Sequence, residues 1–362
     1  MHPSRSNEAV EPVPLRYAAD TLVSFASELL RRAGLDAEMA AAVASVLVDG
    51  DLLGHTTHGL QLLAPYLGEI DRGTMRVSGT WETVSRRPAT ELWDGRRLPG
   101  PWLVLRALDR AAAMAAKQGT GTVSIRRSHH IACLAAYLKR ATDAGFMMLL
   151  TCSDPAVCSV APFNAVTPVF TPNPIAAGIP TSGDPILLDI SASLTTNGLT
   201  SRLHNEGRRL PHPWVQDHEG NPTDDPGVLF REPKGTLLPT GGIDAGHKGF
   251  GLALLIEALT GGLTGHGRAD PAEGWGATVY VHLIAPDAIG GSDAFTRQMD
   301  WLAEACHAAR PRKGIERVRL PGERGMQRYR EQKAEGVALY PGIMSTLAPL
   351  AARYGVDLPT AL

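Results

Sequence analysis

The hydrophobic pattern changes its period near residue 122, and this change limits the folds that the chain can adopt. Before that point, apolar residues recur at helical spacing over 19–34 and 36–55. After it, short apolar runs of strand length at 122–127 and 146–152 enclose a helical pattern. The order predicts a mixed α/β region that follows a helical one.

Glycine, proline and N-cap residues indicate where the predicted helices begin and end. Gly34 ends the first predicted helix, Asp36 is a good N-cap for the second, and Pro65 predicts a kink or break in a third. Further strands are expected over 165–180, 185–191 and 277–285, a loop-heavy stretch over 205–244 and an apolar helix over 249–265. We predict four parts: a flexible arm (1–14), a helical N-terminal part (15–121), a central domain (122–290) and a helical C-terminal part (291–362).

Composition limits the partners. The 362 residues are 44% hydrophobic and carry a formal net charge of −2, so electrostatics gives no reason to expect nucleic acid or an acidic membrane surface. No stretch approaches the roughly 20 apolar residues of a membrane span, and the first residues lack a signal-peptide core. The four cysteines form no CxxC pair. We therefore expect a cytoplasmic protein with no membrane or nucleic-acid partner.

A nucleotide cofactor is the first chemistry to test. A Rossmann domain needs GxGxxG between a strand and a helix, whereas "GTGTVS" and "GFGLAL" each supply two of the glycines and follow no clear strand. The Gly-rich turn around Lys248 in "GHKGFGLAL" still suits a phosphate at a helix N-terminus. Close helix packing explains the same glycines equally well.

Histidines offer acid–base chemistry. His55 and His58 in "GHTTHGLQLLAPY" lack the HExxH pattern of a zinc site, and no spacing indicates a third ligand. His129 and His130 are adjacent and must point in different directions, so one can face a cleft while the other faces solvent. No GxSxG motif supports a nucleophilic serine. Proton transfer by histidine fits this pattern better than a metal does.

Seven stretches in order resemble one family, the malate/L-lactate dehydrogenases, which bind NAD(P) without a Rossmann fold. They are "THGLQLLAPYL", "RRSHHIA", "TPNPIAAGIP", "LLDISAS", "GNPTDDP", "GHKGFGLAL" and "GIERVRLPGER". The resemblance covers the chain from about Leu15 to its end. It implies an NAD(P)-binding domain on a mixed, largely antiparallel sheet between helical parts, and a homodimer with its active site near the subunit interface.

The resemblance also implies the site residues. His58 matches the histidine of a Ser-His-Gly motif, His130 that of an Asn-Ser-x-His motif, and both are candidates for proton transfer. Tyr66 matches a tyrosine of the substrate cleft. The positions expected to bind the cofactor are Ser153, Asn173, Asp189, Ile190, Ser191, Ala192, Ser193, Leu194, Thr195, His247, Lys248, Gly322, Glu323 and Arg324.

Departures from the family pattern concentrate on the substrate side. The family's carboxylate-binding arginine is Leu62 here, a lysine is replaced by Leu199, and an asparagine is replaced by Arg127. Leucine cannot form a guanidinium–carboxylate pair, and Arg127 or Arg126 is the candidate replacement. Because the departures lie on the substrate side, we expect the cofactor to be kept: NADPH or NADH, with NADPH favoured. Hydride would pass to or from a C=O or C=N carbon of a 2-oxo or 2-hydroxy acid or of a modified biosynthetic intermediate.

Two alternatives remain open at this point. A catalytically inactive family member would keep the dimeric cofactor-binding scaffold and find no substrate. A metal-dependent hydrolase would use His55 and His58 and contain stoichiometric zinc.

Overall fold

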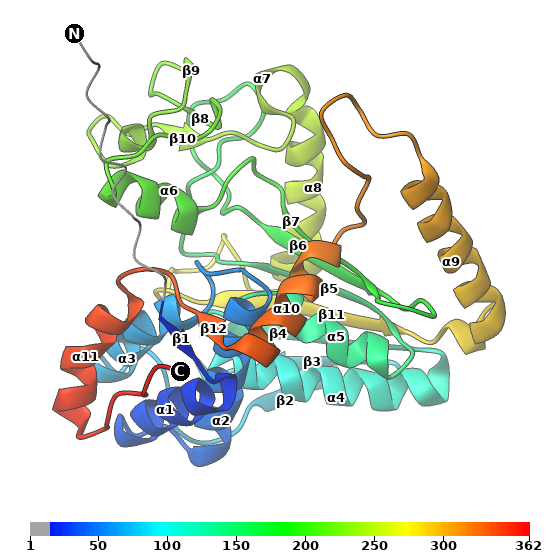
Figure 1. Cartoon of the computed structure of the whole chain (residues 1–362), viewed down its shortest axis with the longest axis horizontal. Coiled ribbons are helices and arrows are strands. Elements are labelled where there is room, and N and C mark those ends of the chain that lie inside the picture. Colours follow the sequence, from blue (N-terminus) through cyan, green and yellow to red (C-terminus); the bar gives the residue numbers. More distant parts are fainter. Residues whose placement is uncertain (1–14) are drawn as a thin grey trace, which may run out of the picture.

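The computed structural model describes residues 15–362 (Figure 1). The predicted flexible arm, 1–14, lies outside the described residues. None of the described helices is both long and apolar enough to cross a membrane.

A mixed sheet forms the centre of the described chain. Its strands lie in the order β2-β3-β4-β11-β5-β6-β7, and all neighbours are antiparallel except β3 and β4. The bounds are Glu82–Arg86 (β2), Thr90–Asp94 (β3), Thr120–Ser128 (β4), Met147–Ser153 (β5), Pro174–Ile179 (β6), Ile186–Ser191 (β7) and Ala277–Ile284 (β11). This architecture confirms the predicted mixed, largely antiparallel α/β fold.

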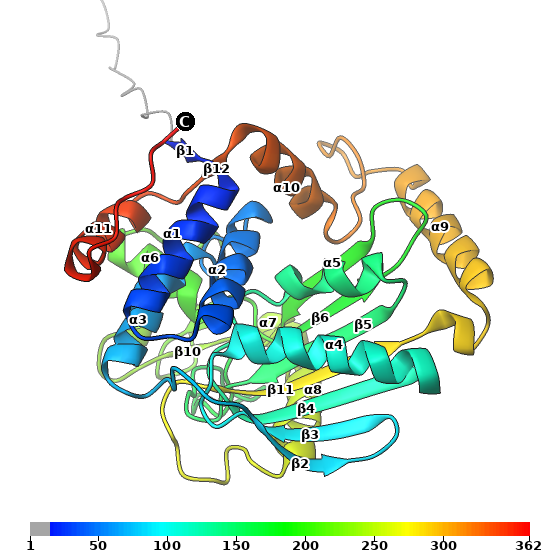
Figure 2. The same ribbon diagram turned by 90° about the horizontal axis from the view of Figure 1, so that it is seen from below.

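Helices cover both faces of the sheet. α4 (Gly100–Gln118) and α5 (Ala135–Asp143) lie along one face, as Figure 2 shows, and α4 packs on β4 and β11. α8 (His247–Glu257) packs against β5, and the π-helical turn that continues it (Ala258–Gly262) packs against β5 and β11. Because both faces are covered, apolar side chains of the central strands are fully buried, among them Val123, Ile125, Leu150, Val279 and Val281.

The N-terminal and C-terminal helices form one lobe beside the sheet. α1 (Ala19–Arg32) packs on α2 (Ala37–Leu52), and α11 (Ile343–Tyr354) packs on α1 and α3 (Leu63–Asp71). α10 (Glu323–Glu335) lies on α2, and the short strands β1 (Arg16–Tyr17) and β12 (Val337–Ala338) pair. One hydrophobic core joins this lobe to the sheet. The two ends of the described chain therefore stabilise the same lobe.

A second, smaller core lies under α6 (Asn197–Asn205) and includes Val160, Phe170, Leu203, Val215 and Ile256. Three short strands cover it: β8 (Val215–Gln216), β9 (Pro222–Thr223) and β10 (Thr236–Leu237). The stretch read as loops over 205–244 thus contains a small sheet of two-residue strands. Such strands are too short for a period-2 pattern to reveal.

α9 (Ser292–Ala308) differs from the other long helices. It projects from the sheet at the right of Figure 1, and none of its residues is buried. Trp301 and Leu302 on this helix are exposed, as is Ile289 just before it.

The local predictions near the N-terminus need three corrections. The predicted helical part contains β2 and β3, which sequence reasoning read as turns, because β2 is exposed on both faces and β3 buries Glu91 and Asp94 in ion pairs. Pro65 causes no internal kink: a 3₁₀ turn (Leu60–Leu62) precedes α3 and puts Pro65 in its first turn. Asp36 occupies the N-cap of α2 but forms no side-chain capping hydrogen bond.

Candidate active site

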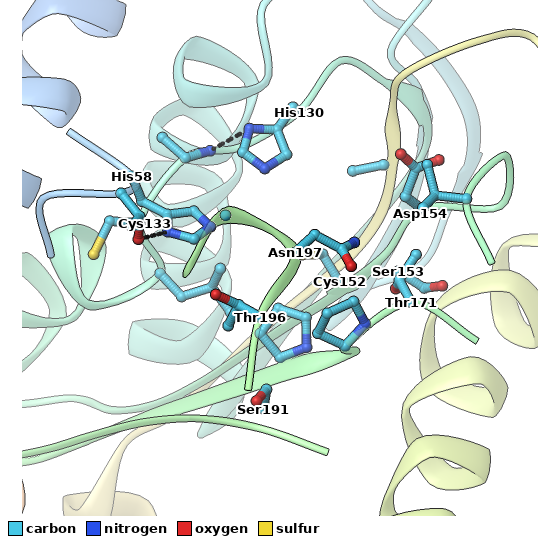
Figure 3. A pocket seen from close by; sticks show the side chains of 18 of the residues that line it. His58, His130, Cys133, Cys152, Ser153, Asp154, Thr171, Ser191, Thr196 and Asn197 are labelled. Carbon is cyan, nitrogen blue, oxygen red and sulfur yellow. Dashed lines mark hydrogen bonds between the residues drawn. The ribbon is translucent and has the colours of Figure 1, made fainter. Parts of the chain in front are cut away.

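A cavity of about 450 Å³ opens where the helical lobe, the sheet and α6 meet (Figure 3). We call one side, with His58, Leu62, His130 and Trp275, the histidine wall. We call the opposite side, with Ser153, Asp189, Ser191, Thr196 and Asn197, the strand-end wall, because β5 and β7 end there and α6 begins there. The two walls face each other across a space large enough for a small molecule.

A buried carboxyl group holds the loop that carries His58. The backbone N–H of Leu60 donates to Asp51 Oδ2 over 2.7 Å, and a Cβ atom at Gly59 would collide with that carboxyl group. Glycine after His58 therefore lets the loop close over α2. Burial raises the pKa of Asp51 to about 7.

His130 is fixed by its neighbours. Its Nδ1 lies 2.9 Å from the Tyr66 hydroxyl and accepts the Ala132 N–H over 3.3 Å, while its ring stacks on Trp275 at a centroid distance of 4.7 Å. A backbone N–H can only donate, so Nδ1 is the acceptor and the neutral ring carries its hydrogen on Nε2. In Figure 3 that second nitrogen is turned toward the cavity.

His58 has a different partner. Its Nδ1 lies 2.9 Å from the hydroxyl of Thr57, and its ring centroid is 6.0 Å from that of His130. A hydroxyl can rotate to donate or accept, so Thr57 can follow a change in the protonation of His58. The family position of the serine hydroxyl is thus occupied by a group of the same chemistry.

His58 and His130 are both neutral near pH 7. Burial, together with the nearby His55 and the Arg202 guanidinium, lowers the pKa of His58 to about 4. Burial also holds the pKa of His130 well below its usual value, and His58 adds to the effect. Two such close rings cannot both take a proton readily.

His129 does not face solvent, contrary to the expectation for the second member of the pair. It is fully buried, and its Nε2 lies 3.2 Å from Glu69 Oε2. Burial is the main cause that lowers the pKa of His129 to about 4, while Glu69 acts in the opposite direction. The helical lobe uses this side chain for its own packing.

Glu257 holds Ser153 of the strand-end wall from behind. The Ser153 hydroxyl donates to Glu257 Oε1 over 2.7 Å, the Asn173 amide donates over 2.9 Å, and Arg268 Nε donates over 2.7 Å. Asn173 is fully buried and does not line the cavity. Asp189 lines it and accepts the Ala135 N–H over 2.9 Å.

The predicted cofactor residues fall into two groups. Ser153, Asp189, Ile190 and Ser191 line the cavity. The others do not line it: Asn173, Ala192, Ser193, Leu194, Thr195, His247, Lys248, Gly322, Glu323 and Arg324. The exposed side chains of His247 and Lys248 lie at the start of α8, and Gly322 packs against Leu187 of β7 where α10 begins.

The predicted substrate residues also fall into two groups, those that line the cavity and those that do not. Leu62 lines the cavity, but Tyr66 is fully buried and reaches the site through its contact with His130. Arg127 does not line the cavity, because its guanidinium pairs with the buried Asp94 at 2.7 Å. Arg126 pairs with the same carboxylate at 3.1 Å. Neither arginine supplies the cation that Leu62 lacks.

Sequence reasoning missed part of the lining. Thr196 and Asn197 come directly after the predicted "DISASLT" segment, and a threonine N-cap before α6 is a signal that could have identified them. Asp154 follows the end of β5. Trp275 and Cys133 stand in loops with no motif, and nothing in the sequence singles them out.

Comparison with known proteins identifies the family of this chain. The family model for malate/L-lactate dehydrogenase matches residues 17–348. The chain belongs to the malate/L-lactate dehydrogenase family. It is therefore an NAD(P)-dependent oxidoreductase that acts on a small molecule, as the resemblance implied.

Individual relatives cover nearly the whole chain. A malate dehydrogenase of Pyrococcus horikoshii is 28% identical over 95% of this chain and 96% of its own length. An L-lactate dehydrogenase of Cupriavidus necator is 29% identical over 93% and 97%. The solved structure of Δ1-piperideine-2-carboxylate reductase from Pseudomonas syringae superposes with a TM-score of 0.81 at 26% identity, over 93% of this chain and 99% of the other.

Proposed function

We propose that this enzyme transfers hydride between NAD(P) and a carbonyl or imine carbon bound between the histidine wall and the strand-end wall. Its substrate would not be held by an arginine–carboxylate pair. The observation that carries this proposal is the cavity lining. It combines His58 and His130 with an apolar Leu62 and, within residues 15–362, contains no lysine or arginine.

The strand-end wall suits a nicotinamide nucleotide. It offers the hydroxyl groups of Ser191 and Thr196, the amide of Asn197 and the carboxylate of Asp189 within one cavity. These are groups that hydrogen-bond to ribose hydroxyls and a carboxamide. When bound there, the cofactor supplies or accepts the hydride. Because His247 and Lys248 lie outside the cavity, they would contact the distal part of the dinucleotide.

His58 would move the proton and His130 would orient the substrate. Protonating His130 on Nδ1 would break its hydrogen bond with the Ala132 N–H, whereas the Thr57 hydroxyl can rotate when His58 takes a proton. In oxidation, neutral His58 accepts the proton of the substrate hydroxyl or amine. His130 donates its Nε2 hydrogen to the reacting oxygen or nitrogen.

The substrate pocket favours a substrate with a flat or apolar substituent over one with a carboxylate at this position. Leu62, Leu134 and Trp275 give it an apolar side, and Asp154 and Asp189 are its two carboxyl groups. Burial raises the pKa of both. The positive end of α6, which begins at Asn197, is the available attraction for an anion, and it amounts to about half a charge.

Leu62→Arg tests this substrate proposal. A guanidinium at this position should raise kcat/KM for 2-oxo dicarboxylates by about 10-fold to 100-fold, the effect of one charge-assisted bidentate pair. The same variant should lower kcat/KM for neutral ketones and cyclic imines. Leu62→Met is the matched control, because it keeps the volume and adds no charge. An unchanged ranking of substrates in Leu62→Arg would contradict the proposal.

NADPH is proposed over NADH on the basis of α10. Arg324 and Arg328 are exposed on this helix, neither forms an ion pair with another described residue, and Arg328 lies against Gly54 next to His55. A cation near the cofactor is what a ribose 2′-phosphate requires. Calorimetric titration with both nucleotides measures the preference. Tight binding with no turnover across the substrate panel would instead favour the inactive alternative.

We also propose a homodimer in the cytoplasm. The apolar side chains of Leu254, Leu255 and Leu263 are exposed along α8 and the turn after it, and a second copy would bury them. All four cysteines are free thiols, as expected in a reducing compartment. Sedimentation of the purified protein gives the oligomeric state.

A further inference from the structure

Three potential metal ligands converge at one end of the cavity. A ring nitrogen of His55, Sγ of Cys133 and a carboxylate oxygen of Asp189 all lie within 4.8 Å of one another. They come from three separate segments: the loop after α2, the loop after β4, and β7. Sequence reasoning considered His55 together with His58 and found no third ligand, because these partners are distant in the chain.

The geometry is close to that of a zinc site. Zinc–ligand distances of about 2.0 to 2.3 Å separate tetrahedral ligand atoms by roughly 3.3 to 3.6 Å. Cys133 Sγ is 3.9 Å from Asp189 Oδ2, so this pair needs to move by only a few tenths of an ångström. Mixed nitrogen, sulfur and oxygen donors in a tetrahedral arrangement are typical of zinc.

The surroundings hold two of the ligands in place and leave the third free. The Ala135 N–H donates to Asp189 Oδ2 over 2.9 Å, and such an outer contact orients a ligating carboxylate. Cys133 is 3% exposed, so its side chain has little freedom. The ring of His55 forms no hydrogen bond with another residue in the described part of the chain and lines the cavity.

We propose that His55, Cys133 and Asp189 bind one zinc ion, whose fourth position faces the cavity. Zinc at this position would occupy the Asp189 carboxylate. If Asp189 contacts the cofactor, as the proposed function has it, zinc and the nicotinamide nucleotide exclude each other. Zinc would then be a reversible inhibitor of the dehydrogenase.

Metal titration of the full-length protein tests the site directly. Metal-free protein is titrated with Co²⁺ and followed by absorption, and then with Zn²⁺ and followed by displacement of cobalt. We expect one equivalent of Co²⁺ with a thiolate-to-cobalt charge-transfer band. The band should disappear in Cys133→Ser and weaken in His55→Gln. It should persist in Cys158→Ser and Cys306→Ser, which are the controls because these are the two thiols that are not buried.

The outcomes separate the site from its consequence. A band that persists in Cys133→Ser, or no stoichiometric binding to the unmodified protein, would overturn the proposed site. His55→Gln guards against a folding defect in the buried Cys133→Ser, because His55 is only partly buried. If zinc binds but does not raise the Kd of NADPH at least about 10-fold, the zinc site stands and the cofactor role of Asp189 is wrong. If zinc raises that Kd in the unmodified protein but not in Cys133→Ser, both inferences are supported.

Discussion

The two walls of the cavity are built in opposite ways. On the histidine wall, the two rings proposed to act on the substrate are held by neighbouring side chains and backbone: His130 by Tyr66, Ala132 and Trp275, and His58 by Thr57. On the strand-end wall, the groups belong to the ends of β5 and β7 and the start of α6, and Ser153 is held from behind by the carboxylate of Glu257.

This difference teaches which wall is free to change. A strand end keeps its position because the whole sheet supports it, so it suits a ligand that is the same throughout a family. The histidine wall includes loop and 3₁₀ positions such as Leu62, where one substitution changes charge without disturbing the sheet. Leu62, where the resemblance implies an arginine, lies on that wall.

Replacing the cavity histidines should have the largest effect on activity. His58→Asn should lower kcat by about 10²-fold to 10⁴-fold, the usual contribution of a positioned general acid–base group, and His130→Asn should fall in the same range. The Kd of NADPH should stay within about threefold of the unmodified value, which is less than 1 kcal/mol. Steady-state kinetics and calorimetry measure the two quantities.

His129→Asn is the matched control from the same dipeptide. It should reduce the free energy of unfolding by about 1 to 3 kcal/mol, because buried Glu69 loses a partner, and leave kcat nearly unchanged. Equal loss of kcat in all three variants would mean that the histidine wall acts only as packing.

The pH profile should separate His58 from an ordinary histidine. The pKa of His58 is about 4, so kcat/KM for oxidation should stay flat from pH 8 to about pH 5 and fall below it. An exposed histidine would lose the neutral base near its usual pKa of about 6.5. A fall in kcat/KM near pH 6.5 would exclude buried His58 as the base.

The lowered pKa of His58 also makes the stability of the folded protein depend on pH. The folded-state pKa of His58 is lowered, so the unfolded chain binds more protons as pH falls from about 6.5 toward 4, and stability is lost across that window. His58→Asn should therefore lose less stability than the unmodified protein on acidification. Urea unfolding at pH 7 and pH 5 measures this difference.

Arg127→Ala should have the smallest effect on catalysis. Its guanidinium serves the buried Asp94 and lies off the cavity lining, so kcat/KM should be unchanged. Stability should fall by about 1 to 3 kcal/mol, because the buried Asp94 keeps Arg126 and the Arg96 N–H but loses one of its two guanidinium partners. A large drop in kcat/KM with unchanged stability would return Arg127 to the substrate site.

Periodicity and motif order were sufficient for much of the fold. The predicted strands at 122–127 and 146–152 appear as β4 and β5. β5 is a nearly continuous apolar run, as expected for a strand covered on both faces, whereas β4 is recognisable from its β-branched residues. β2 and β3 could not be predicted this way. Their stability comes from neighbours, and the buried Glu91 depends on Arg110, which lies on α4.

The site was predictable where it coincided with motifs. His58, His130, Leu62 and Asp189 all line the cavity, but motif order carries no information about side-chain direction, and so Arg127 was misplaced. Residues that loops bring together were invisible for the same reason. Cys133 meets Asp189 because the loop between β4 and α5 crosses to β7, although three strands separate β4 from β7 in the sheet.

Trp275 gives the enzyme an optical probe of its own site. Its ring stacks on that of His130 and lies 5.5 Å from the ring of Tyr66, whereas Trp81, Trp93 and Trp102 cluster together elsewhere. A reduced nicotinamide beside an indole accepts its excitation energy. The difference in emission between the unmodified protein and Trp275→Phe would therefore follow cofactor arrival in real time, without turnover.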